Sequence, residues 1–118
     1  MPGRQRLPRT ERLTRKCDFE WVYQHGTKRV GPHFLCYMAR REGQGRKVGF
    51  AVSRKVGKAT VRNRVKRLIR EVYRRHRSEL AGDLCLVVIA RSSSRELSFE
   101  ECSAAIRRLW SQGGVLHG

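Results

Sequence analysis

The chain has 118 residues, of which 27 are lysine or arginine and 10 are aspartate or glutamate, so its formal net charge is +17. This length is enough for one domain with one modest core. No stretch is long and apolar enough to cross a membrane, and no secretory signal core follows the start. The composition therefore predicts a single domain with a polyanionic partner and no association with a membrane.

The positive charge is unevenly distributed along the chain. Residues 1–77 hold 23 basic and 5 acidic side chains, a net charge of +18, whereas residues 78–118 hold 4 basic and 5 acidic side chains, a net charge of −1. This asymmetry favours a defined polyanion-binding face over a uniformly basic surface.

The chain divides into three predicted parts. Residues 1–12 predict a flexible basic arm, because Pro2 and Pro8 break any amphipathic helix there. A transit peptide is the alternative for such an arginine-rich, acid-poor start. Residues 13–112 predict the single domain, and residues 113–118 predict a short tail.

A helix and two or three strands are the first predicted elements. The segment CDFEWVYQHG predicts a short helix, which Gly26 ends and whose apolar face holds Phe19, Val22 and Tyr23. Residues 34–40 and 46–54 predict two strands, and the polar, glycine-containing loop between them has the length of a hairpin connection. The TKRV segment before Gly31 predicts a further short edge strand.

The second half of the domain predicts helix, strand and helix. A long helix begins near Ala59 or Thr60 and ends near Arg77, and the continuous apolar run at 83–90 predicts a strand covered on both faces. A capping box from Ser98 to Glu101 opens the last helix, whose apolar positions are Phe99, Cys102, Ile106, Leu109 and Trp110. The order of elements predicts a two-layer α/β domain with helices packed on a small sheet.

The long helix has an apolar face and a basic face. Its core stripe consists of Val61, Val65, Leu68, Ile69 and Val72. Opposite this stripe lie Asn63, Lys66, Arg67, Arg70, Arg74 and Arg77, while Arg62 and Arg64 lie at its borders. Like-charge pairs four residues apart each cost about 0.2–0.5 kcal/mol, and only Glu71 offers relief. A solvated face would mix its signs, so we expect this face to contact nucleic acid.

Asn63 and the segment before the helix make this expectation more specific. An amide both donates and accepts, so Asn63 can read a sugar hydroxyl or a base edge that lysine cannot. The segment 53–58 adds Arg54, Lys55 and Lys58 beside the positive end of the helix, which itself attracts phosphate.

Three aromatic residues allow two interpretations. Phe19 and Tyr23 share a helix face, and Tyr37 lies on a strand that can pack beneath them. They are either part of the core or, beside a basic surface, a platform that stacks unpaired bases. Sequence spacing leaves both readings open.

The four cysteines are Cys17, Cys36, Cys85 and Cys102. No two of them form a CxxC pair, so a zinc knuckle or ribbon is not expected. We expect buried, reduced thiols at the last three, which fits a cytoplasmic protein, with a disulfide or a metal as the alternative.

The run SRKVGKATVRNRVKRLIRE at residues 53–71 resembles the signature of the protein subunit of bacterial ribonuclease P. That family carries Lys-x-Gly-x-Ala, then Arg-Asn-Arg, then Lys-Arg, and the corresponding residues here are Lys55, Gly57, Ala59, Arg62, Asn63, Arg64, Lys66 and Arg67. The likeness continues through DFEWVY, FLCY, RKVGFAVS and LVVIAR and covers roughly residues 13–110 in the family's order.

The resemblance implies a fold and a role. The implied fold is an αβββαβα sandwich with a small mixed sheet and a left-handed βαβ crossover, like that of the second domain of ribosomal protein S5. The implied contacts to the catalytic RNA subunit are Arg62, Asn63, Arg64, Lys66 and Arg67. The charge pattern adds Arg54, Lys55, Lys58 and Arg70 to the expected RNA contacts. The implied cleft for the single-stranded 5′ leader of precursor tRNA holds Phe19, Tyr23, Tyr37, Ser53 and Arg91. The protein would act as a monomer within the ribonucleoprotein.

The sequence contains no catalytic constellation and no metal-ligand grouping. This agrees with the resemblance, which implies that the RNA subunit binds Mg²⁺ and cleaves the phosphodiester, while the protein binds no cofactor and broadens the range of substrates. Three rival functions are a structural RNA-binding module without a cleft, a protein-only nuclease, which would need clustered acidic ligands, and a DNA-compacting protein, for which Asn63 would be superfluous.

Overall fold

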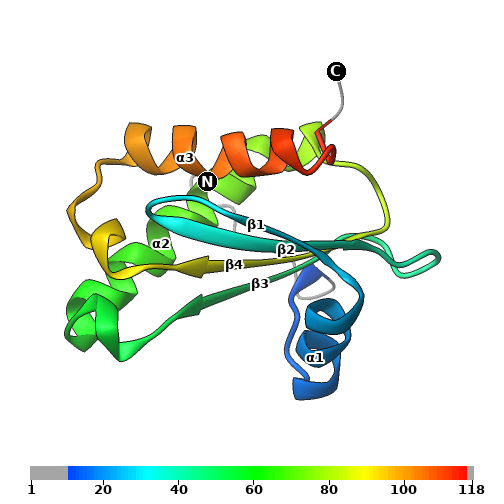
Figure 1. The fold of residues 1–118 in the computed structure, drawn as a ribbon, viewed down its shortest axis with the longest axis horizontal. Coiled ribbons are helices and arrows are strands. Elements are labelled where there is room, and N and C mark those ends of the chain that lie inside the picture. Colours follow the sequence, from blue (N-terminus) through cyan, green and yellow to red (C-terminus); the bar gives the residue numbers. More distant parts are fainter. Residues whose placement is uncertain (1–10, 117–118) are drawn as a thin grey trace, which may run out of the picture.

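The computed structural model of the protein describes residues 11–116 and contains three helices and one four-stranded sheet (Figure 1). Along the chain the elements are α1 (Lys16–His25), β1 (Thr27–Val30), β2 (Phe34–Arg40), β3 (Lys47–Val52), α2 (Ala59–His76), β4 (Leu84–Ala90) and α3 (Phe99–Gln112). The predicted αβββαβα order is confirmed, including the short edge strand β1. Gly26 ends α1, where its N–H donates to the Val22 carbonyl at 2.7 Å.

The sheet is mixed, with the strand order β1-β2-β4-β3. β1 and β2 are antiparallel, as are β2 and β4, whereas β3 and β4 run parallel and are joined through α2. The predicted hairpin between β2 and β3 is therefore wrong, because β4 lies between these strands. Six of the seven residues of β4 are buried. Such an apolar strand is more stable in the centre of the sheet, with a strand on each side and helices on both faces, than at an edge.

Helices cover both faces of the sheet (Figure 1). On one face, α2 and α3 enclose the main core, to which Phe34, Val65, Ile69 and Trp110 contribute. On the other face, α1 covers only part of the sheet, over a smaller cluster of Leu13, Val22, Cys85 and Val87. The incomplete cover by α1 leaves a stretch of sheet open.

The capping box of α3 is confirmed. The Ser98 hydroxyl accepts from the Glu101 N–H at 3.2 Å, and the Glu101 carboxylate accepts from the Ser98 N–H at 2.9 Å. Both bonds satisfy amide donors that a helix start otherwise leaves unpaired. The apolar stripe of α2 is also confirmed, with Tyr73 as an additional buried member that the sequence pattern missed.

The two ends of the domain lie closer to the chain termini than predicted. Glu11 accepts a hydrogen bond from the Tyr73 hydroxyl at 2.6 Å, and the backbone of Arg12 forms an isolated parallel β-bridge with Val48. These two residues therefore belong to the domain rather than to the predicted arm. Val115, assigned to the tail, is buried in the main core, and its carbonyl accepts from the Ala81 N–H at 2.9 Å. Residues 1–10 of the predicted arm and 117–118 of the predicted tail lie outside the described residues.

The cysteines lead to a prediction about thiol reactivity. All four are free, and only Cys17 is exposed. Burial raises the pKa of Cys36 to about 12 and that of Cys102 to about 11, which disfavours the reactive thiolate. We expect one thiol to react rapidly with an aromatic disulfide reagent in the native protein and four after unfolding. The Cys17→Ser variant should lose the rapid phase, and a second rapid thiol would contradict the burial of the other three.

Candidate nucleic-acid interface

The start of α2 and the turn before it carry the basic residues predicted to bind RNA. The 3-10 turn Arg54–Val56 follows β3 directly, and Ser53 caps it by accepting from the Lys55 N–H at 3.3 Å. Gly57 then adopts a φ of 153°, which side-chain-bearing residues rarely reach, and a Cβ there would lie 3.1 Å from Val61. This glycine allows the turn and the helix to meet, so that the turn's cations lie beside the helix start.

Seven of the nine residues predicted to contact the RNA subunit have no side-chain hydrogen bond, ion pair or ring contact within residues 11–116. We call them the basic surface, and they are Arg54, Lys55, Lys58, Asn63, Lys66, Arg67 and Arg70. All are exposed except Lys66, which is half-buried. Six cations without an internal counter-charge and one free amide are therefore available to an anionic partner.

The two arginines that flank Asn63 make contacts inside the domain. Arg62 Nε donates to the Gly57 carbonyl at 3.2 Å, which fixes the turn before the helix. Arg64 donates from its two terminal nitrogens to the carbonyls of Arg95 and Leu97, each at 3.1 Å. In this structure both arginines position loops, and only the amide between them is unengaged.

The C-terminal end of α2 differs from the rest of the helix because the basic residues from Arg74 to Arg77 are paired. Arg74 and Arg75 both bind Glu71, Arg77 binds Glu11 at 2.7 Å, and His76 Nδ1 lies 2.9 Å from Glu79. The expectation that only Glu71 relieves the charge repulsion is therefore wrong. Arg74 and Arg77 belong to this paired end, and only the Glu11 carboxylate comes from a segment distant in sequence.

Glu71 should contribute an acid-sensitive part of the stability. Hydrogen bonds from Arg74, with a smaller contribution from Arg75, lower the pKa of Glu71 from 4.5 to about 2. A carboxyl whose pKa is lower in the folded state stabilises the fold above its unfolded pKa, and this contribution disappears as the pH falls towards about 2. We expect the difference in melting temperature between wild type and Glu71→Gln to be largest above pH 4.5 and to vanish near pH 2.

The exposed loop residue Glu42 provides the control for this prediction, because it forms no ion pair in the described part of the chain. Glu42→Gln should differ little from wild type at every pH. A melting-temperature difference for Glu71→Gln that stays constant from neutral pH to pH 2 would show that the ion pairs do not stabilise the fold.

The three predicted aromatic residues come together on the open face of the sheet. The ring centroids of Phe19 and Tyr23 are 6.5 Å apart, and those of Tyr23 and Tyr37 are 4.9 Å apart in an edge-to-face arrangement. Phe19 lies directly on Gly49, where a Cβ would be only 2.4 Å from the ring. Phe19 therefore belongs partly to the core, whereas Tyr23 is 39% exposed and its ring is accessible to a ligand.

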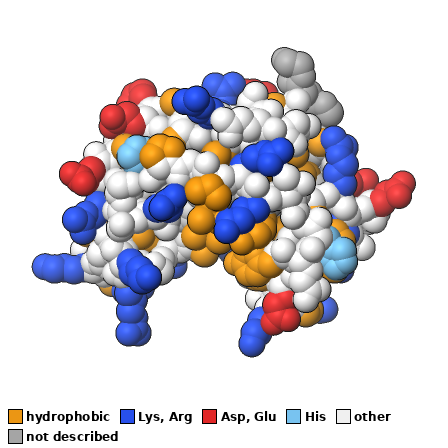
Figure 2. All heavy atoms as spheres, in the orientation of Figure 1, with side chains coloured by type: hydrophobic (Ala, Val, Ile, Leu, Met, Phe, Trp, Pro, Cys, Tyr) orange, Lys and Arg blue, Asp and Glu red, His pale blue; other side chains and the backbone are white. Residues whose placement is uncertain are grey.

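The sequence pattern missed the floor of this site. Beyond the aromatic cluster, Leu35, Ile89 and Ala51 lie side by side on three neighbouring strands and are half-buried. They share the sheet face of Tyr37, because side chains two residues apart on a strand point the same way. We call the surface formed by these three residues with Phe19, Tyr23 and Tyr37 the groove, and Figure 2 shows apolar side chains gathered in a hollow between basic ones.

Cations and polar groups surround the groove. The Lys28 ammonium, also missed, lies 5.8 Å from the centroid of the Tyr37 ring. Its place opposite Tyr37 follows from the β1–β2 register, which the sequence does not reveal. Ser53 and Arg91 lie just after the ends of the neighbouring parallel strands β3 and β4, and both are exposed. The structure thus brings the predicted leader residues to one face of the sheet.

Among residues 11–116, no cluster of three or more His, Cys, Asp or Glu residues has an arrangement that could hold a metal ion. No helix in that same range combines the length and the hydrophobicity needed to span a membrane.

Known proteins resemble this chain in sequence and in structure. A sequence model of the family described as Ribonuclease P matches residues 7–113. The ribonuclease P protein component of Dictyoglomus turgidum is 37% identical over 113 residues, covering 93% of this chain and 94% of that protein. The protein component of Desulfovibrio desulfuricans is 42% identical over 105 residues, covering 87% and 81% of the two chains.

Solved structures agree with these sequence matches. The ribonuclease P protein of Staphylococcus aureus superimposes with a TM-score of 0.83 at 25% identity, covering 91% of this chain and 98% of that one. The ribonuclease P protein of Thermotoga maritima has a TM-score of 0.77 at 27% identity, covering 86% and 96%. In sequence and in fold, the chain belongs to the ribonuclease P protein family.

Proposed function

We propose that this chain works with ribonuclease P RNA, which cleaves precursor tRNA, and that it holds the single-stranded 5′ leader of the substrate in the groove. The basic surface on α2 would bind the RNA subunit. The protein would thereby assist removal of the leader to give the mature tRNA 5′ end and would broaden the range of substrates.

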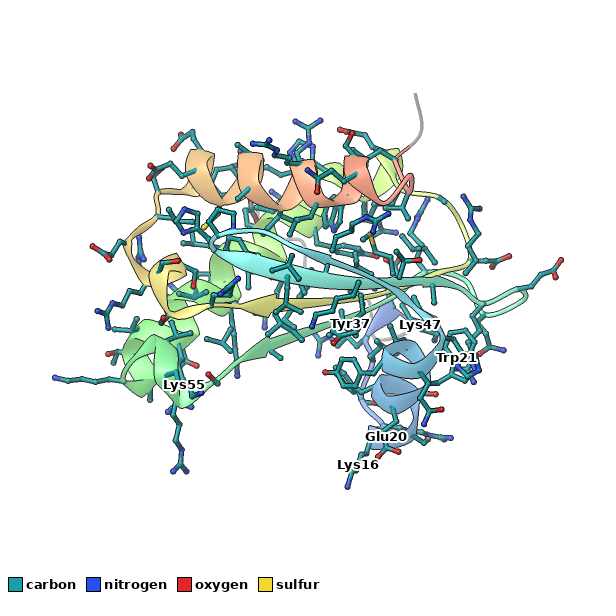
Figure 3. The ribbon with its side chains drawn as sticks, viewed as in Figure 1. Lys16, Glu20, Trp21, Tyr37, Lys47 and Lys55 are labelled. Atoms are coloured by element: carbon teal, nitrogen blue, oxygen red, sulfur yellow. The ribbon has the colours of Figure 1, made fainter. Side chains whose placement is uncertain are left out.

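The observation that carries this proposal is the presence of two different RNA-compatible surfaces close together. The basic surface offers charge with one amide, which suits a folded RNA whose phosphates are densely packed. The groove offers aromatic rings and an apolar floor, which suit unpaired bases. In Figure 3, Lys55 of the basic surface and Lys16 of α1 both project below the sheet, and Tyr37 lies beside α1, above Lys16.

The chemistry of the side chains supports a role in binding for the protein and a role in catalysis for the RNA subunit. The groove holds no carboxylate, histidine or cysteine, because its six residues are aromatic or aliphatic and the cations lie around it. We therefore assign Mg²⁺ binding and phosphodiester cleavage to the RNA subunit and no cofactor to the protein. The proposal includes a cytoplasmic protein that acts as a single copy within the ribonucleoprotein.

The test is a binding comparison with the reconstituted holoenzyme. Tyr23→Ala and Tyr37→Ala should each weaken binding of precursor tRNA, because base stacking on an aromatic ring contributes about 1–3 kcal/mol per base. This corresponds to roughly 5- to 150-fold in the dissociation constant. Binding of mature tRNA, which has no leader, should not change.

Trp21→Ala is the matched control because Trp21 lies on the same helix but stacks on His25 and Arg41 instead of facing Tyr37. It removes an aromatic ring and some packing of α1 without altering the groove. Equal losses for precursor and mature tRNA, or equal losses in Trp21→Ala and Tyr37→Ala, would favour a structural RNA-binding module without a leader site.

A further inference from the structure

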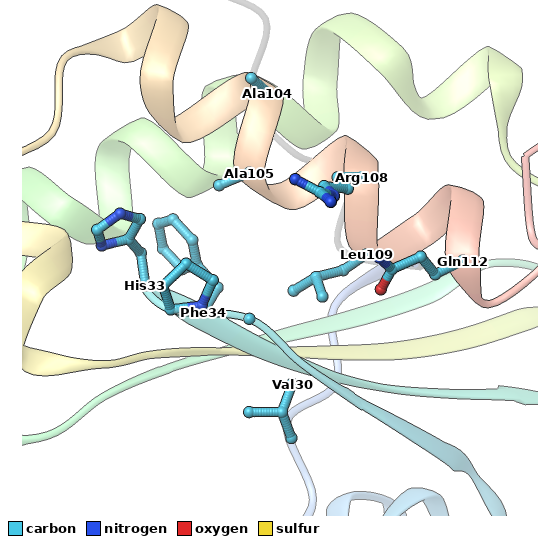
Figure 4. A pocket seen from close by; sticks show the side chains of 10 residues that line it. Val30, His33, Phe34, Ala104, Ala105, Arg108, Leu109 and Gln112 are labelled. Atoms are coloured by element: carbon cyan, nitrogen blue, oxygen red, sulfur yellow. The ribbon is translucent and has the colours of Figure 1, made fainter.

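A second concave site lies at the β1 edge of the sheet, outside the groove and the basic surface. A pocket of about 430 Å³ separates α3 from the turn between β1 and β2 (Figure 4). This volume falls within the roughly 300–1,000 Å³ of sites that hold small organic molecules. Its lining residues are Val30, Gly31, Pro32, His33, Phe34, Ala104, Ala105, Arg108, Leu109 and Gln112.

The pocket combines apolar walls with free polar groups. Phe34 and Leu109 are buried beneath it, and Ala105 leaves open space because its side chain is small. Arg108 and Gln112 project from α3 at its rim (Figure 4) and have no side-chain partner in the described part of the chain. A flat ring with polar edges and an adjacent negative charge fits this arrangement, because the amide both donates and accepts and the guanidinium binds phosphate.

The turn that forms one wall is firmly held. The Arg91 guanidinium donates to the Gly31 carbonyl at 3.0 Å, and the Ser93 hydroxyl donates to the Pro32 carbonyl at 3.0 Å. The Arg91 N–H also donates to the His33 carbonyl at 2.9 Å. The wall is therefore formed before any ligand arrives, which lowers the ordering cost of binding.

The pocket adjoins the groove at Val30, around the β1 edge of the sheet. Val30 lines the pocket, is 54% exposed, and lies opposite Leu35 of the groove floor. Arg91, at the rim of the groove, holds the pocket wall through Gly31. In the order β1-β2-β4-β3, the pocket lies at the edge opposite β3, the strand that leads into the basic surface. A single-stranded RNA leader that enters the groove from the side of the basic surface would reach the pocket last.

We infer that this pocket takes one unpaired leader nucleotide distal to those held in the groove, with its base against Leu109 and Ala105 and its phosphate on Arg108. This inference rests on the proposed function. It extends the leader-binding surface around the edge of the sheet and onto α3, and it assigns a ligand to residues that lie outside the family signature.

The experiment uses the reconstituted holoenzyme and precursor tRNAs whose leaders are lengthened one nucleotide at a time. In wild type, one further nucleotide beyond those bound by the groove should increase affinity about five- to tenfold, the low end for a stacked base because the walls are aliphatic. Ala105→Trp, which fills the pocket, and Arg108→Ala should both abolish this step. Removing only the base of that nucleotide should weaken precursor tRNA binding by the wild-type holoenzyme. It should not weaken binding any further in the Ala105→Trp holoenzyme.

Arg40→Ala is the matched control, since Arg40 is an exposed arginine at the other end of β2 and should leave the step intact. If Tyr37→Ala weakens short-leader binding while both pocket variants keep the full length dependence, the pocket inference is wrong and the proposed function stands. If Tyr37→Ala has no effect with any leader, the proposed function fails. If the pocket variants bind the RNA subunit more weakly than wild type does, the pocket contacts that RNA instead of the leader, and the inference is wrong. Arg108→Ala and the abasic leader carry the test if Ala105→Trp does not fold.

Discussion

Replacing Lys55, Arg67 and Arg70 together by glutamine is expected to weaken binding to ribonuclease P RNA by two or more orders of magnitude at low salt. These cations are exposed and have no internal counter-charge within the described residues. Each phosphate they neutralise releases counterions, which contributes about −0.9 to the slope of log affinity against log salt concentration. The triple variant should therefore reduce the magnitude of that slope by about 2–3 units. Filter binding or fluorescence titration across a salt series measures both quantities.

The paired C-terminal end of α2 provides the control for this charge prediction. Arg75 carries the same charge on the same helix, but it binds Glu71 at 2.9 Å and lies 4.6 Å from the centroid of Phe99. Arg75→Gln should leave the salt slope close to the wild-type value. A triple variant whose slope matches wild type would show that the basic surface is only solvated, and the RNA contact would have to be sought elsewhere.

Replacing Trp110 by alanine should cause the largest loss of stability among single changes in the core. Trp110 is fully buried where α3 packs on the sheet, and truncating a buried tryptophan costs about 3–5 kcal/mol from lost burial and the cavity left behind. Domains of this kind are stable by only about 5–15 kcal/mol. The free energy of unfolding, obtained from urea titration, measures the effect.

Val30→Ala is the comparison for the tryptophan variant because more than half of the Val30 side chain is exposed. Its free energy of unfolding should lie within about 0.5 kcal/mol of wild type. A loss below about 1 kcal/mol for Trp110→Ala would mean that α3 contributes little to the main core, contrary to its packing in the structure.

The local sequence was sufficient to predict the elements, because their signals act over a few residues. The three-residue spacing of Ser98 and Glu101 specifies a helix start through two hydrogen bonds that the structure contains. The unbroken apolar run of β4 predicted a strand covered on both faces, and nearly all of it is buried. The helical period of α2 separated its core stripe from its charged face in the same way.

The site was predicted in part, and the missed residues share one cause. Leu35, Ala51 and Ile89 join the groove because their strands are neighbours in register, and Lys28 reaches Tyr37 for the same reason. Strand order and register depend on contacts between distant segments, which a local pattern does not encode. The predicted β2–β3 hairpin was wrong for the same reason. The loop is short enough for β2 and β3 to pair, but placing β4 between them buries more apolar surface.

The sequence by itself determined that this is a small α/β domain with a strongly basic helix, and its central motif indicated the family. Only the tertiary structure decided which charges are free. Glu11 neutralises Arg77 and Glu79 binds Arg107, while backbone carbonyls engage Arg62 and Arg64. Ion pairs and hydrogen bonds require atoms within about 4 Å, and folding brings such atoms together from segments up to 66 residues apart, as in Glu11 and Arg77.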